Sequence, residues 1–237
     1  MSILSNCKGP PVAAPSTCFN HLDVMTITVR EGVKSKEYHV FHGLLTWHSG
    51  YLAAALSPTS GFHDSGTNSF EFIEDIEVFD TFTCWLYTGK LDDASEPISA
   101  ARPPHLSPLV LSKIWVFADF HIIPALGNAA IDALHEHQAL LWVTPSPVIK
   151  YVYEHTKPDS LLRRYLQDAF TKTMTLESVM SRDKEEHTVE FLHDILLVIA
   201  RRKKGEKLER MQWAKLDRCK WHDHSGPGGR LRMESRK

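Results

Sequence analysis

The sequence predicts an α+β fold in which a short β-sheet is flanked by a helical cluster and followed by an all-helical C-terminal extension. Three observations lead to this prediction. Two runs near the N-terminus are rich in β-branched and apolar residues and are separated by a turn, as in a β-hairpin. Apolar residues then recur at helical spacing through most of the chain. The second half contains no further strand-like run.

The 237 residues are 43% hydrophobic and 24% charged, which is the composition of a soluble globular protein. Residues 1–19 contain three prolines and no periodicity, so we expect a disordered lead-in. No apolar run approaches the roughly 20 residues that cross a bilayer, and no signal-peptide core is present. The four cysteines are too sparse for a disulfide framework. We therefore expect no membrane partner and a location in the nucleus, the cytoplasm or both.

The first elements are a β-hairpin and a pair of helices. Residues 24–29 and 37–41 have the pattern of strands, and Gly32 marks the turn between them. From His42 the apolar spacing changes to that of a helix. A second short helix continues through residues 51–56 and is stopped by the following Ser-Pro.

A third strand and a longer helix follow a polar turn region. Residues 70–73 favour a short strand, and Asp75 is placed to cap the helix after it. Gly89 is expected to end that helix. Residues 90–108 contain four prolines and no apolar face, so we expect an insertion or mobile loop.

The remaining elements are expected to be helices and a tail. Apolar spacing predicts a helical hairpin at residues 109–120 and 124–135, and further helices from 148, at 161–171 and at 189–201. Residues 141–204 therefore form the predicted helical extension, and residues 205–237 form a basic tail that is expected to be partly disordered.

Five segments in order resemble the motifs of the BTB/POZ family. They are residues 42–45, 49–56, 61–65 (Gly-Phe-His-Asp-Ser), 79–89 (ending Trp-Leu-Tyr-Thr-Gly) and 118–130 (Ala-Asp-Phe-His-Ile-Ile-Pro to Asn-Ala-Ala). The resemblance covers residues 20–140 and is greatest to the single-BTB proteins of filamentous fungi. It implies the BTB/POZ fold, protein association through homo- or hetero-oligomers including a homodimer, and no catalysis. Some members recruit a cullin scaffold of a ubiquitin ligase, so a substrate adaptor is the alternative function.

The resemblance also implies which residues meet a partner. In cullin-binding members a hydrophobic residue and an acid two positions later contact the cullin, and Phe62 and Asp64 match this pair. An exposed ring beside a carboxylate is also typical of an interface hot spot, although Phe62 could instead pack over the adjacent helices. A dimer is expected through the exposed strand edge at residues 24–30 or through the helical pair, at Leu44, Leu45, Tyr51 and Leu52.

The net charge of −2 combines two unlike parts. Residues 201–237 hold 13 basic and 5 acidic side chains, a net of +8, so residues 1–200 carry −10. The run Arg201, Arg202, Lys203 and Lys204 follows an apolar helix, where four cations complement the helix dipole. The functional interpretation is a nuclear import signal, and hence a nuclear regulatory protein as a second alternative. No helix-turn-helix or zinc-finger pattern follows, so we do not expect a nucleic-acid partner.

No motif in the sequence points to catalysis. The nucleophile elbow, the dinucleotide fingerprint and the phosphate loop are all missing, so we expect no enzyme and no cofactor. Most of the 14 histidines are expected to be structural. Cys219, His222 and His224 form one ligand-like cluster, but a structural zinc needs four ligands. We therefore predict no metal site and interpret this cluster as part of a solvated tail.

Overall fold

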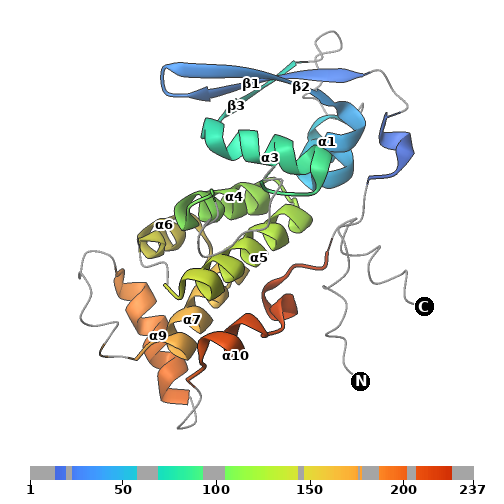
Figure 1. The fold of residues 1–237 in the computed structure, drawn as a ribbon. Coiled ribbons are helices and arrows are strands. Elements are labelled where there is room, and N and C mark those ends of the chain that lie inside the picture. Colours follow the sequence, from blue (N-terminus) through green and yellow to red (C-terminus); the bar gives the residue numbers. More distant parts are fainter. Residues whose placement is uncertain are drawn as a thin grey trace. The chain divides into compact units, whose positions relative to one another are not determined.

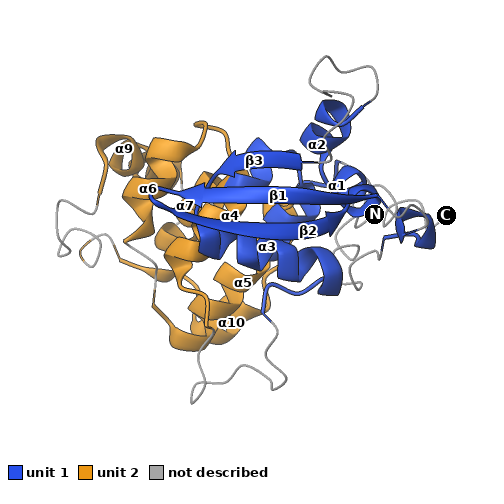
Figure 2. Cartoon of the chain, turned by 90° about the horizontal axis from the view of Figure 1, so that it is seen from above, with its two compact units in different colours: residues 1–94, 117–129, 223–237 blue, residues 95–116, 130–222 orange. Residues whose placement is uncertain are grey.

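The computed structural model describes residues 14–19, 23–57, 69–92, 105–143, 147–175, 177, 187–201 and 207–225. These residues form an α+β protein with a small three-stranded sheet, which confirms the predicted fold class at this level (Figure 1). The chain divides into two compact units (Figure 2). Unit 1 comprises residues 1–94, 117–129 and 223–237, and unit 2 comprises residues 95–116 and 130–222.

Unit 1 contains the 3-10 helix η2 (Ser16–Phe19), then β1 (Val24–Glu31), β2 (Lys34–Phe41), α1 (His42–His48), α2 (Gly50–Ala55), β3 (Ser69–Ile73) and α3 (Ile76–Thr88). Helices α4 (Pro108–Phe120) and α5 (Pro124–Leu141) contribute residues to both units. Unit 2 adds α6 (Val148–His155), α7 (Leu161–Thr173), α9 (Val189–Arg201), α10 (Arg210–Ala214) and the 3-10 helix η4 (Arg218–Trp221). None of the described helices is long and apolar enough to cross a membrane.

The strand order of the sheet is β2-β1-β3. β1 pairs with β2 antiparallel, from Val24 opposite Phe41 to Glu31 opposite Lys34, and Gly32 adopts a φ of 60° in the turn. β3 pairs with β1 in parallel along residues 26–30. The prediction that β1 has an exposed edge at residues 24–30 is therefore wrong, because β3 occupies that edge. The outer strands of the described sheet are β2 and β3.

Helix α3 begins and ends at the predicted residues. The Asp75 side chain accepts a hydrogen bond from the Glu77 amide, and Gly89 ends the helix with a φ of 71°. Phe79 on its buried face has ring-centroid distances of 4.7 Å to Tyr38 and 5.6 Å to Phe72. α3 therefore joins the sheet to the core of unit 1.

Three boundaries differ from the sequence-based expectations. Ser16–Phe19 forms a 3-10 helix with Cys18 buried, so these residues are not a disordered lead-in. A Cβ at Gly43 would collide with the Cys18 carbonyl, which explains the glycine at the start of α1. Pro108 begins α4 and is not part of the loop, and α5 continues to Leu141. Residues 93–104 of the predicted loop lie outside the described residues.

Helix α9 packs within unit 2 through one face. Phe191 is fully buried, with its ring centroid 4.9 Å from that of Phe170 on α7. Asp194 accepts a 3.0 Å hydrogen bond from the Tyr153 hydroxyl of α6. Together with buried Ile195, these contacts fix α9 against α6 and α7.

Residues 207–222 are attached to the core of unit 2 by two tryptophans. Trp213 and Trp221 are 0% and 1% exposed. The Trp213 ring stacks on His135 of α5 at 4.7 Å, and the Trp221 ring meets Tyr165 of α7 at 5.1 Å. The expectation of a solvated tail is therefore wrong for these residues, because two large aromatic side chains bind the segment to α5 and α7.

Basic side chains of this segment pair with acids of the helices. Arg218 lies 3.0 Å from Asp132, and Lys220 lies 2.7 Å from Asp168. α10 spans only Arg210–Ala214, so Lys207 and Lys215 lie outside the helix that carries Arg210. Part of the +8 charge is thus neutralised inside unit 2.

Candidate protein-interaction surface

The predicted partner residues of the helical pair are not all at the surface. Leu44, Leu45 and Leu52 are 1%, 1% and 3% exposed, so the prediction that they meet a partner is corrected: they form the core of unit 1. Tyr51 is the exposed member of this set, at 37%. Phe62 and Asp64 lie outside the described residues.

Two further apolar side chains are exposed near Tyr51, in the link between α4 and α5. Phe120 at the end of α4 is 70% exposed, and Ile122 is 57% exposed. The Tyr51 and Phe120 ring centroids are 6.1 Å apart. We call Tyr51, Phe120 and Ile122 the corner patch.

Hydrogen bonds hold the start of α2 against this corner within unit 1. The Ser49 hydroxyl donates to the His121 carbonyl at 2.7 Å and accepts from the Leu52 amide at 3.0 Å. The Gly50 amide donates to the Ile122 carbonyl at 3.0 Å. A Cβ at Gly50 would lie only 3.0 Å from Ile122 Cγ2, so glycine permits this close approach. Figure 2 shows α2 at one end of the sheet.

His121 forms the base of the corner patch. It is 4% exposed, and its ring centroid lies 5.4 Å from Tyr51, 5.0 Å from Phe120 and 4.2 Å from Phe117. Burial lowers the pKa of His121, although its hydrogen bond to the Phe117 carbonyl opposes this shift. The imidazole is therefore neutral at pH 7 and provides an aromatic support without a charge.

Ile122 has a strained backbone. Its φ is 53°, in the left-handed region that a β-branched residue rarely adopts. Such a conformation costs on the order of 1–3 kcal/mol, and strain of this kind is concentrated at functional sites. The adjacent Ile123 is fully buried and supplies the core contact, whereas Ile122 packs against the Gly50 backbone at the start of α2 and stays 57% exposed.

Ile122→Gly is expected to raise the free energy of unfolding by about 1 kcal/mol, because glycine adopts a positive φ without steric cost. Urea denaturation followed by circular dichroism measures the change. The matched control is Ile73→Gly, which removes an isoleucine that is 87% exposed on β3, where glycine weakens a strand. Equal destabilisation by both substitutions would contradict the assignment of strain to Ile122.

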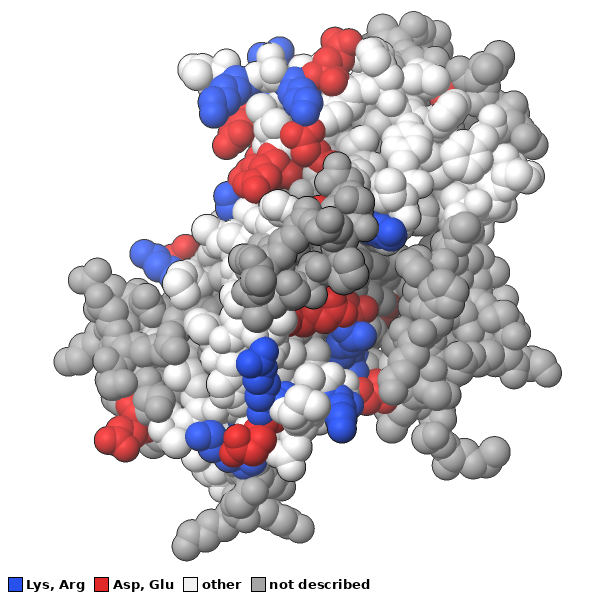
Figure 3. All heavy atoms as spheres, in the orientation of Figure 1, with Lys and Arg blue, Asp and Glu red and all other residues white. Residues whose placement is uncertain are grey.

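The charge distribution of unit 1 is uneven. In Figure 3, Lys, Arg, Asp and Glu gather at the hairpin end of the sheet, whereas the surface over α1 is mostly uncharged. Ala53 and Ala54 of α2 are also exposed, which extends the uncharged surface next to Tyr51. Interface centres are depleted in charge and enriched in aromatic residues, as here.

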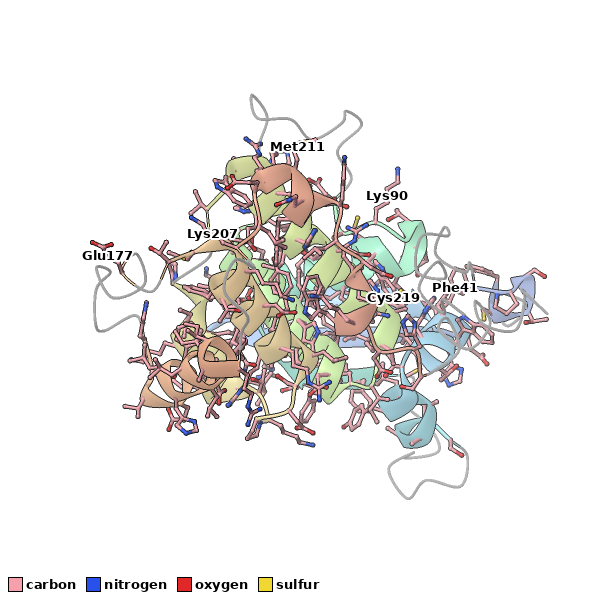
Figure 4. All side chains as sticks on the ribbon, turned by 90° about the horizontal axis from the view of Figure 1, so that it is seen from below. Phe41, Lys90, Glu177, Lys207, Met211 and Cys219 are labelled. Carbon is pink, nitrogen blue, oxygen red and sulfur yellow. The ribbon has the colours of Figure 1, made fainter. Side chains whose placement is uncertain are left out.

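The two other sequence-based candidates lie elsewhere. Arg201 is exposed at the end of α9, and residues 202–204 are outside the described residues, so the import signal stays a prediction. His222 Nε2 lies 3.2 Å from Asp132, and its side chain is buried. Where the structure describes the chain, no three His, Cys, Asp or Glu residues are grouped to hold a metal ion. Cys219, in η4, is labelled in Figure 4.

Sequence reasoning missed Phe120 and Ile122. One signal could have identified Ile122: two consecutive isoleucines precede Pro124 at a tight corner, where only one of them can face the core. Phe120 gave no comparable signal, because the apolar spacing of α4 includes it.

Comparison of the chain with protein-family models and with curated proteins found no match.

Proposed function

We propose that this chain is a non-catalytic protein-interaction module and that unit 1 binds a protein partner through the corner patch. The observation that supports this proposal most strongly is the exposed aromatic side chain of Phe120 beside a strained, exposed Ile122. The contacts of these side chains with Gly50, Tyr51 and His121 leave more than half of each exposed. This exposed apolar area meets the requirement of an interface hot spot, which is a rigid aromatic anchor that loses water on binding.

The rigidity of the patch also supports the proposal. The hydrogen bonds of Ser49 and Gly50 hold the start of α2, which carries Tyr51, and the His121 ring packs against the Tyr51 and Phe120 rings. Side chains that are already ordered lose less conformational entropy when a partner binds. The corner patch is therefore suited to binding without rearrangement of unit 1.

The order of elements supports a BTB/POZ assignment, which we propose for residues 20–140. A hairpin, a helical pair, a third strand, a helix and a helical hairpin follow one another as the sequence resemblance implies. A cullin scaffold is then one candidate partner. Phe62 follows the C-terminal end of α2 by only a few residues, so the proposed cullin pair is close in sequence to the helix of Tyr51.

Phe120→Asp is expected to reduce partner capture by about 30-fold, which corresponds to a hot-spot contribution of about 2 kcal/mol. The measurement is quantitative affinity purification of the full chain from its native cell. Ile73→Asp is the matched control, because Ile73 is an exposed apolar residue of the same unit outside the patch. If Phe120→Asp stays folded and still captures the partner as well as the unmodified chain does, the proposal is wrong.

A second arm of this experiment uses a purified cullin N-terminal domain. If the chain binds this cullin domain and both Phe120→Asp and Phe62→Ala abolish the binding, the adaptor function is identified. Partner capture without cullin binding would keep the interaction module and remove the adaptor alternative.

A further inference from the structure

Helix α9 has two apolar faces. One face is buried in unit 2 through Phe191 and Ile195, which are 0% and 1% exposed. On the opposite face, Val189, Leu196 and Leu197 are 79%, 51% and 41% exposed. A helix packed on one side usually shows charged residues on the other, so this second face requires a separate explanation.

The exposed face has the spacing of a two-helix seam. Val189, His193, Leu196 and Ala200 are separated by four, three and four residues, and all four are exposed. This alternation of three and four matches the core positions of a two-stranded coiled coil. Leu197 lies beside this line and widens it. We call these five residues the α9 seam.

The charges at the two ends of α9 indicate the partner. Glu190 is in the first turn and Arg201 is in the last, and both are exposed. Eleven residues correspond to about three helical turns, so both side chains lie along the same flank of the seam. If a second α9 runs antiparallel, Glu190 of each copy approaches Arg201 of the other. In a parallel pair, the Glu190 and Arg201 side chains of the two copies would lie on opposite flanks of the seam and would not meet.

We propose that the α9 seam is a self-association surface, at which a second copy of this chain packs its own α9 in antiparallel orientation about a two-fold axis. The contact is isologous, because the same seam is used by both copies. One Glu190–Arg201 ion pair forms at each end of the seam, and the antiparallel helix dipoles add to the attraction. The seam lies in unit 2 alone and does not depend on the corner patch.

The first test is sedimentation equilibrium of the full chain from about 1 to about 200 µM, because so short a seam implies a dissociation constant on the order of 10 µM. A reversible monomer–dimer equilibrium is expected. Leu196→Glu should weaken it by at least about 100-fold, since two buried carboxylates would then meet at the seam. Met211→Glu is the matched control, because Met211 is 66% exposed elsewhere in unit 2 (Figure 4). A monomer throughout, or a dimer that Leu196→Glu leaves intact, would overturn the proposal.

The second test is charge reversal at the ends. Glu190→Arg and Arg201→Glu should each weaken the dimer by about 5-fold, and the double variant should restore it, because the ion pairs are then re-formed with opposite polarity. If these charges acted only on the dipole of α9, the double variant would be weaker than either single variant, and the antiparallel arrangement would be wrong. Phe120→Asp should leave dimerisation unchanged, so this inference and the proposed partner binding fail independently.

Discussion

Lowering the pH from 7 to 4 is expected to reduce the free energy of unfolding by up to about 3 kcal/mol for each of two histidines, the half-buried His48 in unit 1 and the buried His135 in unit 2. Burial lowers the pKa of His48 to about 4, and burial together with the nearby Arg218 charge lowers the pKa of His135 to about 4. The His48 ring meets Trp85 edge-on at 5.0 Å, and His135 stacks on Trp213.

The direction of the pH effect follows from these pKa values. The ordinary pKa of histidine is 6.5, so between pH 6.5 and pH 4 the unfolded chain binds more protons than the folded chain. Stability is therefore fully present above pH 6.5 and is lost progressively as the pH falls toward 4. The loss should occur in both units, because each contains one of the two histidines.

Urea denaturation at pH 7, 5.5 and 4.5 measures this dependence. His48→Phe and His135→Phe keep an aromatic ring at each position but cannot be protonated, so each should flatten the curve. A pH dependence between 6.5 and 4 that persists undiminished in the double variant would show that other groups cause it.

Trp213→Ala is expected to lower the free energy of unfolding of unit 2 by about 3–5 kcal/mol, because it leaves a large cavity in the core. Trp213 is 0% exposed, and its ring contacts those of His135, Tyr165 and Trp221. The same substitution should also loosen residues 207–222, which are attached to unit 2 through Trp213 and Trp221.

Thermal and urea denaturation followed by far-UV circular dichroism test this expectation without relying on tryptophan fluorescence. Met211→Ala is the matched control on the same short helix, where a 66% exposed side chain should matter by less than about 0.5 kcal/mol. If both variants unfold at the same urea concentration, Trp213 is not the anchor of this segment.

Local signals were sufficient to predict much of unit 1. The hairpin turn at Gly32, the Asp75 cap and the end of α3 at Gly89 each depend on a few neighbouring residues, and the structure confirms all three. The parallel pairing of β3 with β1 is a contact between distant segments, and no local pattern specifies it. For that reason the prediction of an exposed β1 edge was wrong.

Local sequence patterns also predict the candidate site incompletely. Apolar spacing on α1 and α2 identifies a buried face, but the spacing alone does not separate core from interface. Leu44 and Leu52 proved to be core, and Tyr51 proved to be exposed. The pair of isoleucines before Pro124 indicates that one of them is exposed, but the positive φ that distinguishes Ile122 is a property of the folded backbone.

The C-terminal segment was misjudged because its charge dominated its composition. Net charge favours a solvated segment, but it does not report where the opposite charges lie in the fold. Asp132 and Asp168, far away in sequence, pair with Arg218 and Lys220. Trp213 was the contrary signal, since a large aromatic residue in a basic segment seldom stays in water.

The most direct test of the proposed interaction module measures partner capture and the free energy of unfolding on the same Phe120→Asp and Ile122→Gly proteins. We expect Phe120→Asp to lose capture by about 30-fold while its stability changes by less than about 0.5 kcal/mol. We expect Ile122→Gly to lose capture while its stability increases. Undiminished capture by both folded variants would contradict the assignment of the corner patch as the partner-binding surface.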